Sequence, residues 1–346
     1  MKLSVIVPIY NIKAEYLDCC IRSLSAESMK EMEILLVDDG SKDYCRKICE
    51  QHAAVDERIH YIYQENRGVS VARNRGIQNS FGEYLMFVDA DDWIEPGICS
   101  KAYEIAHDRD LDLLLFGYKT NYINRENLRI MKTSVQDLMK PEVLQLAILQ
   151  GDSRLGNIDV GTPWAKLIKR SVITENGIGY IEGIKKGQDT LFSLYLLEKC
   201  EKISYSPIVG YHYRVSDLSV SKRYNPNIVE VMGATLREYH NFIREYDKGA
   251  SFETALEKKC VRVFLNEFFP LYFFHKKNQN SSKETNRELD ELSVKEPYKS
   301  ALRGVRGDGM IEKLELALLR GRKYQCLRFV KNAERIVKDI IIKKYE

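Results

Sequence analysis

The chain has 346 residues, a formal net charge of +3, and 44% hydrophobic and 30% charged residues. This length suits one large domain with an extension, or two domains, and the composition is that of an ordinary soluble protein. The net charge is too small to indicate a nucleic-acid partner, and no RNA-binding signature occurs along the chain. We therefore expect no nucleic acid among its partners.

Cysteine usage and hydropathy indicate the compartment. The eight cysteines occur at irregular spacings without a Cys-x-x-Cys pair, so neither a zinc site nor a disulfide framework is predicted. Residues 1–8 have the pattern of a strand instead of a signal peptide, and no stretch reaches the roughly 18 apolar residues of a membrane span. We expect a cytoplasmic protein that is neither secreted nor integral to a membrane.

Short β-branched runs alternate with amphipathic helical segments through the first third of the chain. This alternation predicts an α/β fold in which a largely parallel sheet is covered by helices. The predicted strands are Leu3–Pro8, Glu33–Val37, Ile59–Tyr63, Tyr84–Val88 and Asp112–Gly117.

The pattern changes twice further along the chain. Between residues 118 and 223 it predicts helices at Pro141–Gln150 and Gln188–Lys199 and a strand around Ile208–Arg214, which we assign to the second half of the same domain. Beyond Tyr224 the chain is helical almost throughout, which indicates a separate helical extension.

Polar loops follow the first four predicted strands. They are Tyr10-Asn11, Asp38-Asp39-Gly40-Ser41, Asn66-Arg67-Gly68 and Asp89-Ala90-Asp91-Asp92. Ligands of open α/β sheets bind outside the carboxyl ends of the strands, so we expect these loops to form one site. The first loop lacks the Gly-x-Gly-x-x-Gly fingerprint, which argues against a nicotinamide enzyme.

The fourth loop offers two carboxylates at i and i+2, Asp89 and Asp91. Hard oxygen ligands of this kind suit Mg²⁺ or Mn²⁺ bridged to phosphates. The alternative is an acidic turn that caps the helix after Pro96. In the second loop, Asp39 can accept the imide N–H of a pyrimidine, or it belongs to an Asx turn.

The third loop places arginines around the start of a helix. Guanidinium groups and a helix N-terminus both attract phosphate oxygens. Of these arginines we select Arg73 as a phosphate contact; the alternative is that they are solvated or ion-paired.

Taken in order and spacing, these motifs resemble family 2 glycosyltransferases of the GT-A fold. The matching segments are Val5–Asn11, Val37–Ser41, Asn66–Gly76, Phe87–Asp92, Pro163–Arg170, Gly187–Phe192 and Tyr211–Arg214, followed by Ser219 and Ser221. The resemblance covers roughly residues 1–222. It implies a GT-A domain with a nucleotide-binding half (1–118) and an acceptor-binding half (119–222), followed by the helical extension 223–346.

The resemblance also implies roles for single residues. Asp91 would bind the divalent metal, Mn²⁺ or Mg²⁺, and Asp189 would be the catalytic base that takes a proton from the acceptor hydroxyl. The donor nucleotide would contact Pro8, Tyr10, Asp39, Asn66, Arg73 and Asp89.

The acceptor side departs from the family pattern. Gln188 stands where the family usually has Glu, and Ala165 stands where it often has Asn. Gln188 is a candidate acceptor or diphosphate contact. Trp164 is either a sugar platform or a core aromatic. His212 and Arg214 are candidate diphosphate contacts, with a packed or surface histidine as the alternative.

The C-terminal segment forms a predicted basic amphipathic helix. Residues 320–346 contain nine Lys/Arg and three Asp/Glu, with apolar residues at helical spacing from Cys326 to Ile341. Such a helix can lie peripherally on the inner face of an anionic membrane, or its apolar stripe can pack on Phe264–Phe274.

By resemblance, the expected function is inverting transfer of a sugar from a UDP-sugar. The acceptor would be a hydroxyl of a glycan or lipid-linked saccharide in surface polysaccharide biosynthesis. A metal-dependent nucleotidyltransferase and a non-catalytic sugar-nucleotide-binding protein remain alternatives.

Overall fold

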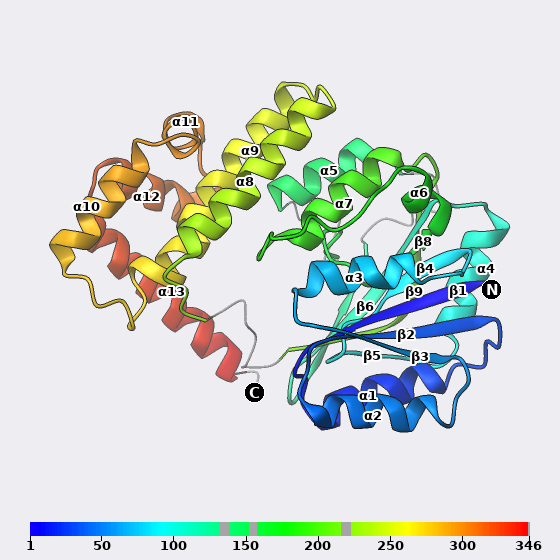
Figure 1. The fold of residues 1–346 in the computed structure, drawn as a ribbon. Helices are drawn as coiled ribbons and strands as arrows, with labels where there is room; N and C mark the ends of the chain where they lie inside the picture. Colours follow the sequence, from blue (N-terminus) through cyan, green and yellow to red (C-terminus); the bar gives the residue numbers. More distant parts are fainter. Residues whose placement is uncertain (132–138, 152–157, 216–222, 345–346) are drawn as a thin grey trace. The chain divides into compact units, whose positions relative to one another are not determined.

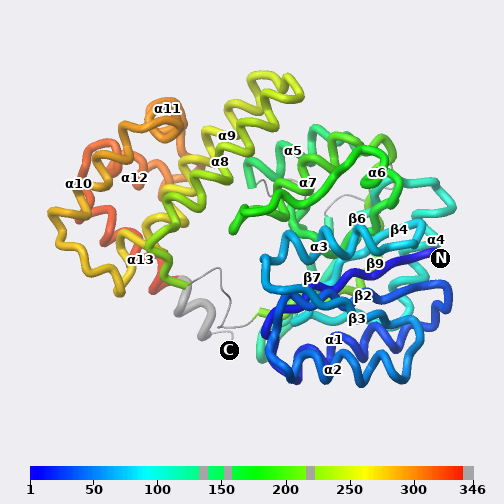
Figure 2. The backbone as a smooth tube through the Cα atoms, viewed as in Figure 1, coloured from blue at the N-terminus to red at the C-terminus, as the bar shows by residue number. Residues whose placement is uncertain are grey.

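The computed structural model describes residues 1–131, 139–151, 158–215 and 223–344 (Figures 1 and 2). The chain divides into two compact units. The first lies within residues 1–215, and the second comprises the chain beyond residue 215 with the short segments 123–125 and 149–151. The predicted boundary after residue 222 borders residues 216–222, which lie outside the described residues, and it stays a prediction.

A mixed sheet forms the centre of the first unit. Its strand order is β3-β2-β1-β4-β8-β6-β9-β5, with β7 paired to β6. The strands β3, β2, β1 and β4 run parallel, whereas β8 is antiparallel to both of its neighbours. The strands are β1 (Leu3–Ile9), β2 (Met32–Asp39), β3 (Ile59–Gln64), β4 (Tyr84–Phe87), β5 (Trp93–Ile94), β6 (Leu113–Asn121), β7 (Glu126–Arg129), β8 (Lys166–Lys169) and β9 (Ile203–Arg214).

Helices cover both faces of this sheet. Figure 1 shows α1 and α2 side by side on one face and α3 on the opposite face. The helices are α1 (Ala14–Ser25), α2 (Asp43–Ala53), α3 (Val69–Gln78), α4 (Ile98–Asp108), α5 (Pro141–Gln150), α6 (Arg170–Glu175) and α7 (Gln188–Lys199). The predicted α/β architecture and the predicted bounds of α5 and α7 are confirmed.

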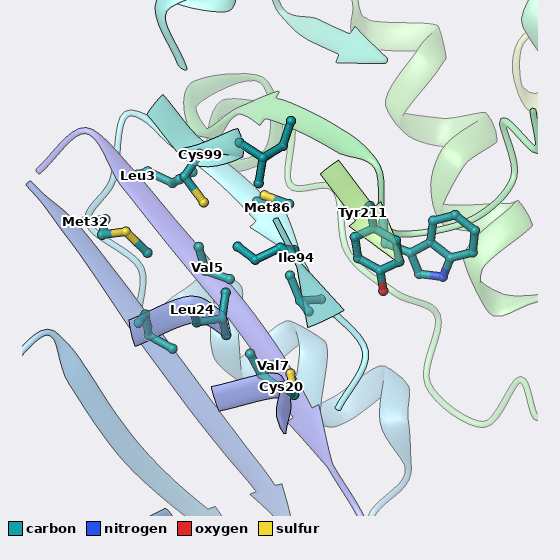
Figure 3. Close-up of a cluster of buried hydrophobic side chains, with 14 of the residues drawn as sticks. Leu3, Val5, Val7, Cys20, Leu24, Met32, Met86, Ile94, Cys99 and Tyr211 are labelled. Carbon is teal, nitrogen blue, oxygen red and sulfur yellow. The ribbon is translucent and has the colours of Figure 1, made fainter. Parts of the chain in front are cut away.

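The core follows from the two periodicities of the sequence. Alternate residues of β1 (Leu3, Val5 and Val7) point into one apolar cluster, which Figure 3 shows. Cys20 and Leu24 of α1 enter the same cluster from one helical stripe. Each fully buried Leu or Val contributes about 1.5–3 kcal/mol, so this packing fixes β1 and α1 against each other.

The sequence pattern missed three strands and predicted β2, β6 and β9 shorter than they are. β5, β7 and β8 have at most four residues each, which is too short for a period to show. β9 begins five residues before the predicted start, because Pro207 interrupts the pattern and the ladder absorbs it in a register shift opposite Phe116 and Gly117. All eight cysteines are free, as predicted.

The second unit is helical, as predicted. None of the helices in the part of the chain that the structure describes has the length and apolarity needed to span a bilayer. Its elements are α8 (Ile228–Glu245), α9 (Ala250–Val263), a π-helical segment (Phe264–Phe273), α10 (Ser282–Ser293), α11 (Tyr298–Gly304), α12 (Gly309–Arg320) and α13 (Tyr324–Lys344).

Helix α13 packs through its first turn, and Lys331 further along it pairs with Glu315 of α12 (2.6 Å). Tyr324 and Leu327 are buried, whereas Phe329, Ile336 and Val337 are 75%, 54% and 54% exposed. These three share one helix face at i, i+7 and i+8. The apolar stripe predicted for this helix is therefore exposed there, and its predicted packing on Phe264–Phe274 is wrong for these residues.

Candidate active site

Neighbouring parallel strands bring the first two loops together. Since β1 and β2 pair in parallel, their carboxyl ends meet at one edge of the sheet. The Asn11 N–H donates to Ser41 Oγ (3.0 Å), and the Lys42 N–H donates to Asn11 Oδ1 (3.0 Å). Pro8 is half-buried beside this edge and Tyr10 is 52% exposed, so the tyrosine ring is accessible to a ligand.

Asp39 organises the third loop. This residue ends β2 with 2% exposure, and its carboxylate accepts the backbone N–H groups of Arg67 and Gly68 (both 2.8 Å). Asn66 Nδ2 donates to the Asp39 carbonyl oxygen (3.0 Å). Gly40 permits this close approach, because a Cβ there would lie 2.7 Å from the Asn66 nitrogen. Asp39 and Asn66 thus lie together, and their nucleoside contact stays a prediction.

Arg73 joins two carboxylates that are far apart in the sequence. Its side chain is 4% exposed on the buried face of α3. Nη1 lies 2.5 Å from Asp189 Oδ1, and Nη2 lies 2.9 Å from Asp89 Oδ1. The guanidinium also lies over the Tyr180 ring, 5.2 Å from its centroid. The ion-paired alternative for this arginine is what the structure shows, and contact with phosphate stays a prediction.

The acidic turn is held from behind by Asp92 and Arg214. Asp92 is fully buried; Tyr211 Oη donates to its Oδ2 (2.5 Å) and the Arg214 N–H donates to its Oδ1 (2.7 Å). The Arg214 side chain donates from Nε to the Asp91 carbonyl oxygen (2.7 Å) and stacks on the Trp93 ring at 4.4 Å. Arg214 therefore supports the turn through both its backbone N–H and its guanidinium, and its predicted contact with a diphosphate stays a prediction.

Asp89 and Asp91 form an electrostatically strained pair. Burial, and next the Asp89 carboxylate, raise the pKa of Asp91 to about 6. A bound divalent cation relieves such repulsion, and Mg²⁺ often uses one or two carboxylates together with substrate phosphates. Within the described residues no group of three or more His, Cys, Asp or Glu side chains is placed to hold a metal. Metal binding by Asp91 therefore depends on further ligands, such as the phosphates of a bound nucleotide, and it stays a prediction.

The loops and the acidic turn lie within a segment that a protein-family model matches. The model describes glycosyl transferase family 2 and matches residues 4–177. The chain belongs to glycosyl transferase family 2. It is 30% identical over 265 residues to EpsH of Bacillus subtilis (strain 168), covering 75% of this chain and 74% of EpsH.

This family 2 transferase is also similar to a second sequence relative and to a solved structure. It is 28% identical over 297 residues to a poly(ribitol-phosphate) beta-glucosyltransferase of Bacillus spizizenii, covering 84% of this chain but 43% of that protein. The crystal structure of S. aureus TarS 1–349 in complex with UDP-GlcNAc superposes with a TM-score of 0.68 at 21% identity, covering 97% of this chain and 92% of TarS 1–349. This likeness confirms the GT-A fold.

In the transferase, Asp189 has the surroundings of a base. It lies in the first turn of α7 with its side chain 30% exposed. Burial raises the pKa of Asp189 above its ordinary value; Arg73 and Lys166 oppose this effect, and Asp89 and Asp159 add to it. A carboxylate with a raised pKa is a stronger proton acceptor. Its role in catalysis stays a prediction.

Two of the predicted acceptor-side contacts, Trp164 and His212, are packed against other rings. Trp164 is 5% exposed and stacks on Tyr211, with centroids 4.8 Å apart. It is a core aromatic here and presents no free face for a sugar. His212 Nε2 lies 3.0 Å from Glu95 Oε1, and its ring stacks on Trp93. His212 is therefore a packed histidine in this structure. Gln188 directly precedes Asp189 on α7, and its contact with an acceptor or diphosphate stays a prediction.

Several buried polar atoms near the Arg73–Asp189 pair have no hydrogen-bond partner among the described residues. They are Ser70 Oγ, Arg73 Nε, Tyr180 Oη and Gln188 Oε1. Buried polar atoms are normally satisfied in proteins, so these atoms are positions for ordered water or for polar groups of a ligand. Tyr180 belongs to no sequence motif and was not among the predicted site residues. Its backbone N–H donates to Asn74 Oδ1 (2.7 Å), and its carbonyl oxygen accepts from Asn74 Nδ2 (2.8 Å).

Proposed function

We propose that this family 2 transferase moves a hexosyl or N-acetylhexosaminyl group from a UDP-sugar to a saccharide hydroxyl, with inversion at the anomeric carbon. The bridge from Asp89 through Arg73 to Asp189 carries this proposal. A single guanidinium bonds both Asp189, the predicted base, and Asp89, the predicted donor contact. A base in this position can act on an acceptor oxygen that attacks the donor.

The proposed chemistry needs one proton acceptor. Arg73 occupies Asp189 Oδ1, so the acceptor proton would pass to Oδ2 as the hydroxyl oxygen attacks the anomeric carbon. Asp89 would orient the donor, and Asp39 would keep the nucleoside loop in place. A divalent metal bound by Asp91 and the diphosphate would stabilise the negative charge that develops on the leaving UDP.

The choice of donor and acceptor class rests on the relatives. TarS binds UDP-GlcNAc, and the B. spizizenii relative is a glucosyltransferase of a polyol-phosphate polymer. The first supports a UDP-sugar donor and the second a polymer acceptor. The acceptor we propose for this chain is a surface polysaccharide or its lipid-linked precursor. The family assignment and the paired Asp89 and Asp189 argue against a nucleotidyltransferase and a non-catalytic binding protein.

A donor screen tests this proposal. Purified protein is incubated with Mn²⁺ or Mg²⁺ and each of UDP-glucose, UDP-galactose, UDP-GlcNAc, GDP-mannose and dTDP-glucose, and release of the nucleoside diphosphate is measured. We expect release from a UDP-sugar, loss of release with EDTA, and thermal stabilisation by UDP with metal. Release from GDP-mannose or dTDP-glucose alone would contradict the donor assignment.

We also propose that α13 places the enzyme peripherally on the cytoplasmic face of an anionic membrane. The exposed stripe of Phe329, Ile336 and Val337 supports this, because apolar side chains flanked by basic residues insert between anionic head groups. Arg328 and Arg335 are exposed on the same helix. Membrane contact would bring the transferase to a lipid-linked acceptor.

Vesicle sedimentation tests the membrane contact. We expect the protein to sediment with phosphatidylglycerol vesicles more than with phosphatidylcholine vesicles, and the double variant Phe329→Ser/Ile336→Ser to lose this binding. Met310→Ser is the matched control, since Met310 is 87% exposed on α12. Equal sedimentation of the double variant and the control would contradict the proposal.

A further inference from the structure

Lys166 is a buried cation in the first unit that the proposed chemistry does not use. It is 3% exposed at the start of β8, and its ammonium donates to Val160 O (2.5 Å), to Thr162 O and to Ser193 Oγ (3.0 Å). All three acceptors are neutral oxygens. Burial lowers the pKa of Lys166 to about 8, so the ammonium remains the main form at neutral pH.

A charge in this position is costly. A buried ammonium without a bonded carboxylate loses its hydration and regains only part of that free energy from neutral acceptors. An apolar side chain of similar length would serve packing at lower cost. The arrangement therefore indicates a role for the charge and its hydrogen bonds beyond filling the core.

The three acceptors belong to two segments that meet at the predicted base. Ser193 lies four residues after Asp189 on α7, so both side chains lie on the same helix face. Val160 and Thr162 belong to the loop before β8. This loop packs against the first turn of α7, since a Cβ at Gly161 would lie 3.3 Å from Thr190 Cγ2.

We infer that Lys166 is a positioning residue, which ties the base-bearing face of α7 to the 160–162 loop and thereby holds Asp189 in register with the acceptor. This inference rests on the proposed function. Because Lys166 is 3% exposed, it would act through Ser193 and the loop and not by contact with a sugar. It also adds a positive charge near Asp189, alongside Arg73, against the negative charges of Asp89 and Asp159.

Two variants separate the hydrogen bond from the charge. Lys166→Met removes both, and we expect kcat for transfer to fall about 100-fold, as for a displaced catalytic group, while UDP binding stays within about threefold. Loss of this neighbouring cation raises the pKa of Asp189, so the acid limb of the pH dependence of kcat should move to higher pH. Ser193→Ala keeps the charge, and we expect a five- to twentyfold lower kcat with the limb unmoved.

Ser204→Ala controls for the loss of a buried serine. Ser204 is fully buried on β9 and accepts from Arg109 Nη1 (2.9 Å), away from α7, so transfer should be unchanged. If Lys166→Met does not fold, Ser193→Ala decides alone. Wild-type kcat in Ser193→Ala, or equal losses in Ser193→Ala and Ser204→Ala, would overturn the inference. A wild-type protein inactive with every UDP-sugar would instead refute the proposed function.

Discussion

Arg73 Nη1 lies 2.5 Å from Asp189 Oδ1, although 116 residues separate the two in the chain. The same guanidinium bonds Asp89. One buried cation therefore offsets the repulsion between two carboxylates at the carboxyl end of β4. The predicted base is therefore oriented in the protein itself. One Asp189 oxygen is used for this orientation, and the other is left for an acceptor.

Replacing Arg73 with Met should leave two partly exposed carboxylates facing each other. We expect the free energy of unfolding to fall by about 2–3 kcal/mol at pH 7, below the loss for a fully buried pair because each carboxylate is about 30% exposed. The loss should be smaller at pH 5, since protonation removes the repulsion. Chemical denaturation at both pH values measures this difference.

Arg75→Met is the matched control for that change. Arg75 is exposed on the same helix, so its loss should leave the free energy of unfolding within about 0.5 kcal/mol of wild type. Equal destabilisation by the two replacements would mean that the bridge adds nothing.

The pH dependence of transfer should report Asp189. A base must be deprotonated to act, so kcat falls as the pH drops through its pKa. Burial raises the pKa of Asp189 above the ordinary 3.8, and the acid limb should accordingly lie above pH 3.8. Single-turnover rates with saturating donor give this limb. A limb at or below 3.8 would show that another group limits the reaction.

Asp91 and Asp92 should respond differently to the same replacement. Asp91→Ala should keep the fold and abolish the metal dependence of UDP binding in a thermal shift assay. Asp92→Ala should lower the free energy of unfolding by about 2–3 kcal/mol, because Tyr211 Oη and the Arg214 N–H lose their buried acceptor. If UDP binding in Asp91→Ala still responded to metal, Asp91 would not be its ligand.

Replacing Asp39 with Ala should loosen the third loop. The N–H groups of Arg67 and Gly68 lose their acceptor, and we expect a loss of about 2–4 kcal/mol in the free energy of unfolding. UDP affinity should fall as well, because Asp39 and Asn66 are the predicted contacts of the nucleoside. Denaturation and UDP titration of the same variant check both effects. An Asp39→Ala protein with wild-type stability would contradict the role assigned to its carboxylate.

The sequence predicted elements whose signal is local. β1, α5 and α7 have clear periods or end signals, and the strand-end positions of Asp39 and Asp89 follow from parallel pairing. The insertion of β8 between β4 and β6 had no local signal, because four residues pair only through distant partners. The ion pair of Arg73 with Asp189 could not be predicted either, since it depends on the position of α7 in the folded domain.

For Trp164 and His212 the structure shows the packed alternative, which residue type alone did not decide. Trp164 and His212 were judged by residue type, but their surroundings come from β9 and β5, which lie next to each other only in the folded sheet. Burial decides whether an indole packs or binds, and a single sequence does not state burial. Tyr180 was missed because its place beside Arg73 depends on the contact between Asn74 and the loop before α7.

The most direct test of the account is Asp189→Asn in the purified protein, with UDP-sugar, metal and saccharide acceptor. Asn keeps the shape but cannot take the proton, so transfer should fall about 1,000-fold or more while UDP affinity stays within a few-fold of wild type. Transfer at the wild-type rate in Asp189→Asn would contradict the assignment of Asp189 as the base.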